Sequence, residues 1–140
     1  MSDLCEVTHK EDNLKKANLA KANLIQANLK GADLEEAHLE GADLDWAVLV
    51  GANLAKCYLV GADLIGTNLE RANLYKANLT KANFAEANLK NANMAEANLE
   101  GASYLTVDQL SKVKTLYNAK LDEKLLISLK EKYPALFKKP

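Results

Sequence analysis

The stretch KANLIQANLKGADL, from Lys21 to Leu34, decides the fold because it carries a leucine at every fifth position. Leu24, Leu29 and Leu34 each follow Ala-Asn or Ala-Asp. On an α-helix five residues turn about 500°, so successive leucines would lie roughly 140° apart and share no face. On a flat strand an odd period sends successive leucines to opposite faces. The chain must therefore bend once in each five-residue repeat.

The five-residue repeat runs from Leu14 to Leu99 as 18 consecutive units. Each unit reads alanine, then asparagine or aspartate, then leucine, then two further residues. We call these positions the alanine slot, the outer slot, the leucine slot, and the first and second corner positions. A short period kept over so many units predicts a stacked repeat array. The exceptions are Phe84 and Met94 in the leucine slot, Asp12, Cys57 and Thr67 in the alanine slot, and His38, Val48 and Tyr58 in the outer slot.

The spacing within a unit predicts which side chains are buried. The alanine and leucine slots are two residues apart, so in an extended segment they point to one side and the outer slot points to the other. The two remaining residues must form a corner. All six glycines occupy the second corner position, where a type II turn needs a positive φ. At corners without glycine, such as those of Lys16 and Trp46, we expect a turn with negative φ, which would give corners of two kinds.

These A(N/D)LXX units resemble those of pentapeptide-repeat proteins, over roughly residues 12–103. The resemblance implies an all-β fold, a right-handed, four-sided parallel β-helix with one unit on each side and 20 residues in each coil. Leucines would then stack into ladders inside the coils, and residues 20 apart would be neighbours in the stack. Opposite charges 20 apart, as in Lys15-Lys16 and Glu35-Glu36, should pair across neighbouring coils.

The five-residue register stops after Ala102, and residues 104–140 are predicted to form a C-terminal two-helix cap. An open solenoid needs such a cover, since its last coil would otherwise expose unpaired backbone groups. The stretch TVDQLSKVKTLY begins with a capping box, Thr106 and Gln109, and apolar residues recur at helical spacing as far as Tyr117. It predicts the first helix of the cap.

The second helix of the cap should begin with Asp122 as its N-cap and run through LLISLKEK. It should end near Tyr133-Pro134, because the residue before a proline avoids the α region. We expect Tyr133, Leu136 and Phe137 to anchor this end of the chain on the last coil. At the other end, residues 1–11 are predicted to form a loose arm or a partial coil, which leaves residues 12–103 as the regular β-helix.

Composition argues against several classes of partner. A net charge of −1 gives no attraction to nucleic acid or to membranes. The chain has no apolar run near the ~20 residues of a membrane span, and residues 1–11 lack the apolar stretch of a signal peptide. Cys5 and Cys57, the two cysteines, lie far apart in the register and are interpreted as reduced thiols rather than a disulfide. These observations predict a cytoplasmic protein.

The sequence offers no recognisable catalytic or cofactor chemistry. Its two histidines, His9 and His38, lie in different contexts, and no cysteine or histidine pair has metal-ligand spacing. The glycines occur singly at corners, so no glycine-rich loop is available to hold a phosphate. The four serines lie outside the regular units and belong to no motif with histidine. We therefore expect no metal, no cofactor and no enzymatic activity.

The irregular units cluster between residues 38 and 67 and indicate a candidate contact surface. His38 and Tyr58 are 20 apart and should stack on the outside of one side. Trp46 should lie between Ile25 and Ile65, with Gly66 leaving room for its indole. An exposed apolar stripe often marks a contact site, although local packing in which Trp46 covers its neighbours and stiffens the rod accounts for the same residues. The candidate contact residues are Ile25, Trp46, Ile65, Val48, Val50, His38 and Tyr58.

The favoured function is a non-enzymatic rigid scaffold that presents columns of side chains to an unidentified protein partner. The protein would act as a monomer, or as a dimer formed through its N-terminal end or its Trp46 side. The alternative comes from the resemblance, since some pentapeptide-repeat proteins mimic DNA and modulate DNA gyrase. Mimicry requires a strongly negative rod, whereas residues 12–103 hold 12 acidic against 9 basic residues and residues 104–140 carry a net charge of +4.

Overall fold

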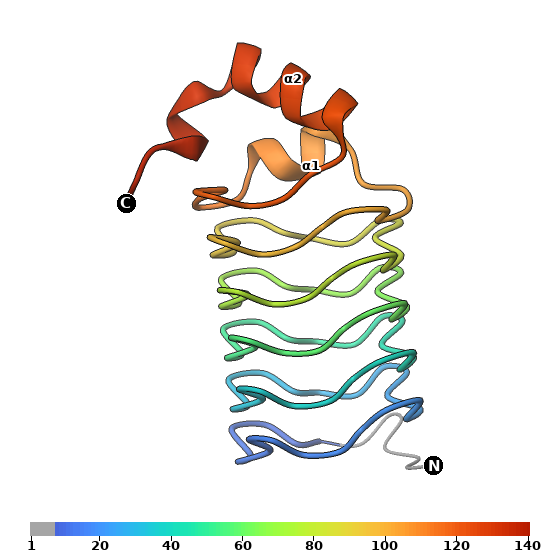
Figure 1. Cartoon of the computed structure of the whole chain (residues 1–140). Coiled ribbons are helices and arrows are strands. Elements are labelled where there is room, and N and C mark those ends of the chain that lie inside the picture. The colour runs from blue at the N-terminus through green and yellow to red at the C-terminus, as the bar shows by residue number, and fades with distance from the viewer. Residues whose placement is uncertain (1–7) are drawn as a thin grey trace.

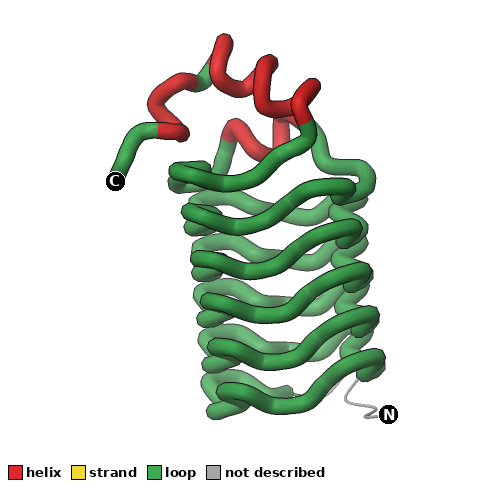
Figure 2. The backbone as a smooth tube through the Cα atoms, viewed as in Figure 1, coloured by secondary structure: helices red, strands yellow, loops and turns green. Residues whose placement is uncertain are grey.

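The chain forms a rod of stacked coils that is closed at one end by helices (Figure 1). The computed structural model describes residues 8–140. The described chain begins in the coil furthest from the helices, and the C-terminus lies beside them (Figure 1). Figure 2 shows the coils as loops and turns, with helix confined to the capped end. The rod therefore has helices at one end, and the described chain begins at the other.

Parallel β-bridges between outer-slot residues 20 apart hold the coils together, as in Asn53 with Asn73. The N–H of Leu54 donates to the carbonyl of Asn73 at 2.7 Å, and the N–H of Asn73 donates to the carbonyl of Ala52 at 2.9 Å. Each side offers only one bridged residue, so the described residues contain isolated bridges rather than continuous strands. Four such sides complete each 20-residue coil, which confirms the predicted four-sided parallel β-helix.

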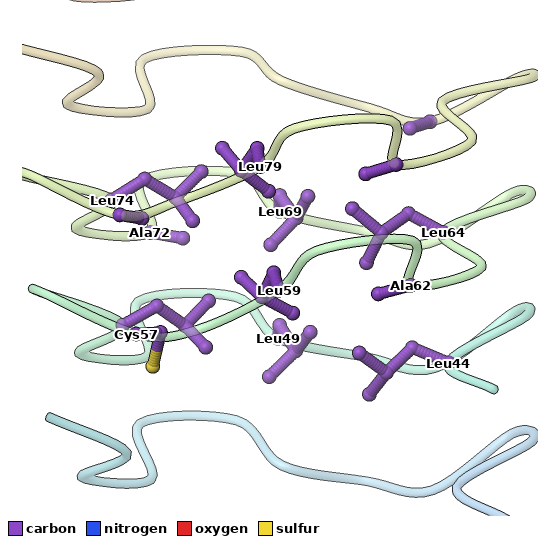
Figure 3. Packing of buried hydrophobic residues seen from close by; sticks show 14 of the residues in the cluster. Leu44, Leu49, Cys57, Leu59, Ala62, Leu64, Leu69, Ala72, Leu74 and Leu79 are labelled. Carbon is purple, nitrogen blue, oxygen red and sulfur yellow. The ribbon is translucent and has the colours of Figure 1, made fainter. Parts of the chain in front are cut away.

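The interior of the rod is built from the leucine and alanine slots. Leucines of neighbouring coils stand above one another, as Leu64 does over Leu44 and Leu69 over Leu49 (Figure 3). All four side chains are buried. Alanine lets the facing walls approach closely, and the resulting core is continuous along the whole stack. A buried ladder of this kind stabilises the rod through apolar area removed from water at every coil.

Two polar side chains replace alanine inside the rod, and each finds a partner. The thiol of Cys57 donates to the carbonyl of Leu34 at 2.7 Å. The hydroxyl of Thr67 donates to the carbonyl of Leu44 at 2.8 Å. Because a buried polar group without a partner would be costly, these bonds explain how the alanine slot accepts the substitutions. Cys57 and Thr67 therefore serve the core, as their position in the register predicts.

The corners are of one kind, which contradicts the expectation of two. Lys16 and Trp46 both have φ 60°, close to the 66° of Gly51. At each corner the alanine-slot N–H donates to the preceding leucine carbonyl, as Ala22 does to Leu19 at 3.0 Å. A corner of another type would move the chain out of register with the coils above and below. The stack therefore imposes positive φ on ordinary residues, although it costs each about 1–2 kcal/mol.

The outer slot supports the corner that follows it. The Oδ1 atom of Asn18 accepts the N–H of Ala20 at 3.3 Å, and Asn23 accepts the N–H of Ile25 in the same way at 3.2 Å. The first corner N–H points outward, so the short Asn or Asp side chain gives it a partner that the backbone does not supply. This local bond explains why asparagine and aspartate dominate the outer slot.

The first helix of the cap, α1 (Val107–Ser111), is shorter than predicted. It starts at the expected capping box of Thr106 and Gln109, but it ends at Ser111 instead of continuing to Tyr117. Residues 112–121 then return to the coil, where Thr115 bridges to Asn93 and Lys120 to Asn98. The solenoid thus extends beyond residue 103, into the segment predicted as a purely helical cap.

The closing elements are α2 (Glu123–Lys132) and the 3₁₀-helix η1 (Pro134–Phe137). The predicted boundaries of α2 are confirmed, with Asp122 as N-cap and Tyr133 as C-cap. The Asp122 carboxylate accepts the N–H of Gly101 at 3.1 Å and so ties the start of α2 to the coil below. Leu136 and Phe137 pack against the core as expected, but Tyr133 is 41% exposed and is not an anchor.

The predicted N-terminal arm is only partly described. Within it, His9 already belongs to a coil, because its N–H donates to the carbonyl of Asn28 at 2.7 Å. The N–H of Glu11 donates to Lys30 in the same way at 2.9 Å. Residues 8–11 therefore form part of a coil, while residues 1–7, including Cys5, lie outside the described residues.

Candidate functional site

Trp46 occupies a second corner position, and its indole lies against Gly66 of the next coil. A Cβ added to Gly66 would overlap the indole ring of Trp46. The expectation that Gly66 leaves room for the indole is therefore confirmed. Trp46 remains 52% exposed, so the contact with Gly66 fixes the ring without burying it. The result is an exposed aromatic surface on a corner of the rod.

Ile25 and Ile65 belong to the first corner column, beside the column of Trp46. The side chain of Asp45 stands between them in the register, and its Oδ1 accepts the N–H of Ile65 at 3.1 Å. Both isoleucines are half-buried. In place of the predicted line of three apolar groups, exposed Trp46 lies beside half-buried Ile25 and Ile65, and the carboxylate of Asp45 lies between the two isoleucines.

Val48 and Val50 lie on the side of the coil that follows Trp46, and both are half-buried. Val48 takes the outer slot, where it bridges to Asn28 and Asn68 through its backbone. Its side chain has no oxygen to accept the N–H of Val50, so this unit lacks the local bond that supports other corners. The two valines extend the apolar surface around the corner from Trp46.

His38 and Tyr58 stack on another side, as predicted. Their ring centroids are 4.5 Å apart and the ring planes differ by 5°. The Nδ1 atom of His38 lies 3.0 Å from an oxygen of Glu40, and Tyr58 is 42% exposed. One complete side, that of Asp43 and Asp63, separates this pair from the Trp46 corner. The seven candidate contact residues are therefore divided between two groups.

The side between the two groups carries a set of carboxylates that the sequence interpretation missed. Asp43 and Asp63 are bridged neighbours in the outer slot, and Asp45 occupies the adjacent corner. The pKa of Asp45 is raised, chiefly by burial and then by repulsion from Asp43, with Asp63 adding to it and the hydrogen bond from Ile65 opposing it. Residues 20 apart are neighbours in the stack, so the sequence already places Asp63 next to Asp43, with Asp45 at the adjacent corner.

Elsewhere on the rod, two pairs of opposite charges join neighbouring coils. Lys15 lies 3.3 Å from Glu35 and Lys16 lies 3.8 Å from Glu36, which confirms the predicted pairing. Exposed pairs of this kind are worth at most about 1 kcal/mol each. Among residues 8–140, no lysine or arginine pairs in this way with Asp43 or its two acidic neighbours. The carboxylates beside Trp46 thus differ from Glu35 and Glu36, which have a lysine partner in the neighbouring coil.

The described residues contain no group of three or more His, Cys, Asp or Glu side chains that could hold a metal ion. Within residues 8–140, no helix combines the length and the apolar character that crossing a bilayer requires. A cleft of about 620 Å³ lies beside α1, and Glu86, Tyr104 and Gln109 are among its lining residues. None of the candidate contact residues lines this cleft, so Trp46 and its apolar neighbours lie apart from it.

The geometry defines a β-helical repeat solenoid with an exposed aromatic corner. The sequence model for "Pentapeptide repeats (8 copies)" matches residues 13–51, 47–84 and 82–103. The chain belongs to the pentapeptide-repeat family. Its fold is accordingly the right-handed β-helix of that family.

Two solved cyanobacterial structures show the likeness in detail. Rfr23, a pentapeptide-repeat protein from Cyanothece 51142, is 37% identical with a TM-score of 0.57 over 72% of this chain and 60% of that one. HetL comes from Nostoc sp. strain PCC 7120 and is involved in heterocyst differentiation regulation. It is 32% identical with a TM-score of 0.62, over 84% of this chain and 61% of HetL. The chain thus spans about three fifths of their lengths. No curated protein matches it.

Proposed function

We propose that the protein is a non-enzymatic scaffold that binds a protein partner through the Trp46 surface, defined as Trp46 with Ile25, Ile65, Val48 and Val50. The observation that carries the proposal is the pairing of Trp46 with Gly66, which holds a large aromatic ring at 52% exposure. Aromatic anchors of this kind dominate the energetics of protein interfaces, and a preformed one loses little conformational entropy on binding.

Capture of partners from native cell extract tests the proposal. Trp46→Lys should keep the corner, since Lys16, Lys56 and Lys76 adopt the same conformation with φ between 56° and 60°. The matched control is Tyr104→Lys, because Tyr104 is also an exposed aromatic residue with positive φ but lies beside α1. We expect Trp46→Lys to lose a partner that wild type and the control retain, at an unchanged melting temperature.

Local packing predicts the opposite pair of results. If Trp46 only stiffens the rod, Trp46→Lys should lower the melting temperature and retain every partner that wild type captures. Modulation of DNA gyrase is the alternative function, and a supercoiling assay with purified gyrase distinguishes it from the scaffold. We expect no effect on supercoiling, because cation–carboxylate pairs such as Lys15 with Glu35 neutralise part of the rod.

A further inference from the structure

The carboxylates beside Trp46 specify the kind of partner that this surface would bind. The chain has no lysine or arginine between Lys30 and Lys56, and none between Lys56 and Arg71. Two neighbouring coils therefore bring acidic side chains to the outside with few cations to offset them. Elsewhere on the rod two acidic residues have cationic partners in a neighbouring coil, Glu35 with Lys15 and Glu36 with Lys16. Negative potential accordingly concentrates next to the exposed indole.

The contacts of the three aspartates differ from those of a regular side. The N–H of Ile65 donates to Asp45 in the coil before it, and not to Asp63 of its own unit. Asp63 therefore lacks the corner bond that most outer-slot residues make, and its carboxylate is left for other contacts. Asp43, in contrast, accepts the N–H of Asp45 at 3.1 Å. Asp43 and Asp63 bear the same charge as Asp45 on this side, and their repulsion adds to the effect of burial in raising the pKa of Asp45.

We propose that the Trp46 surface binds a protein segment that presents arginine beside an apolar residue. An arginine guanidinium can stack on the exposed indole and at the same time donate hydrogen bonds to the carboxylates of Asp43 and Asp63. The apolar neighbour would cover Ile65. A cation at this place also relieves the repulsion among the aspartates, so charge complementarity favours this occupant over an acidic or neutral segment.

The inference rests on the proposed role of Trp46 as a contact residue and adds the charge of the partner. Trp46 is the one tryptophan of the chain, so its fluorescence reports binding directly. The probes are the peptides acetyl-Leu-Arg-Ile-Arg-Leu-amide and acetyl-Leu-Glu-Ile-Glu-Leu-amide, titrated at low and high salt. We expect the arginine peptide to bind at least about tenfold more tightly than the glutamate peptide, and to weaken as salt screens the attraction.

The variant Asp43→Asn/Asp63→Asn isolates the carboxylates. Asparagine occupies the same slot at Asn23 and Asn83, so the fold accepts it. The matched control, Glu35→Gln/Glu36→Gln, changes the net charge equally on another side. We expect the first variant to weaken the arginine peptide by about tenfold or more and the control to leave the affinity within about twofold.

Each contrary outcome has a distinct meaning. Equal binding of both peptides, or full affinity in Asp43→Asn/Asp63→Asn, would overturn the inference while leaving Trp46 as a contact residue. If the arginine peptide does not bind wild type, the inference is also overturned. The capture experiment with Trp46→Lys then tests the proposed function independently. A shift of Trp46 fluorescence with protein concentration alone would make a second copy the occupant and so refute the assignment.

Discussion

Single residues determine how this regular rod acquires an irregular surface. Trp46 replaces a corner residue that is glycine or charged in most other units, and Gly66 stands where the next coil must yield space for the ring. The two residues form a matched pair: the small one allows the large one to lie flat. Substitution of either should therefore affect the other.

Gly66→Lys tests this pairing. Lysine is common at this corner position, but here its Cβ would overlap the indole of Trp46, so the ring must leave its place. We expect a loss of about 1–3 kcal/mol beyond that of Gly61→Lys, where nothing lies within 4 Å of an added Cβ. Urea unfolding and Trp46 fluorescence measure both effects. In a Trp46→Lys background the difference between the two glycine variants should vanish, and its persistence would contradict the pairing.

Because of Cys57, the free energy of unfolding should fall as the pH rises above about 9. Burial raises the pKa of its thiol to about 12 from the ordinary 9.0. Above about pH 9 the unfolded chain releases this proton while the folded chain keeps it, so the free energy of unfolding falls as pH rises towards 12. Relative to Cys57→Ala, wild type should lose roughly 1.5 kcal/mol between pH 8 and pH 10.

Urea unfolding in a Cys5→Ser background measures the difference between Cys57 and alanine. Alanine fills the same slot in most units, so Cys57→Ala leaves the coil intact and removes only the ionisable group. Parallel pH profiles for the two proteins would mean that the buried thiol ionises as easily as an exposed one.

Whole elements show where the sequence was informative and where it was not. The five-residue leucine period predicts the coils, because neither an α-helix nor a flat strand gathers those leucines on one face. Asp122 and Pro134 predict the boundaries of α2. The early end of α1 was missed because Val113 and Leu116 fit a helical spacing. Leu116 and Leu121 are also five apart, and backbone pairing with the last coil favours that register.

The candidate site was only partly predictable for a similar reason. The stacking of His38 on Tyr58 and the space above Gly66 follow from adding 20 to a residue number. The conformation of the Trp46 corner could not be predicted in this way, because its positive φ is imposed by the neighbouring coils and not by the residue type. The charged surroundings of Trp46 likewise depend on which coils are adjacent.

The cap should be needed to prevent the exposed last coil from associating with other molecules. Gln109 of α1 donates to the carbonyls of Phe84 at 2.8 Å and of Ala87 at 3.1 Å, which lie at the edge of the coil below. Truncation after Ala102 removes these donors and uncovers Leu99, so we expect soluble aggregates or higher oligomers. Size-exclusion chromatography with light scattering checks this.

Gln109→Leu provides the milder comparison for that truncation. It removes the two hydrogen bonds to the coil and the capping-box bond from the N–H of Thr106, but it leaves the cover in place. It should therefore cost about 1–3 kcal/mol without causing aggregation. A monodisperse, stable truncation would show that the helices are an independent appendage.

At the scale of the whole molecule, the rod is a one-dimensional stack in which each coil contacts only its neighbours. Stability is then carried by the ladder of inward leucines, while the outer surface is free to vary. This division explains how one framework can accept Trp46, His38 and Tyr58 without losing its register. It also means that damage to one inner position spreads to the coils on both sides.

Leu54→Lys and Lys56→Glu test this division within a single unit. Leu54 is buried near the middle of the stack, and lysine there would place a charge among leucines with no partner, so we expect unfolding or aggregation. Lys56 is an exposed corner residue two positions away, and its change to glutamate should alter stability by less than about 0.5 kcal/mol. Glutamate already occupies that corner position at Glu36, with the same positive φ. Far-ultraviolet circular dichroism during thermal unfolding compares the two variants, and equal tolerance of both would contradict a core built from the leucine slots.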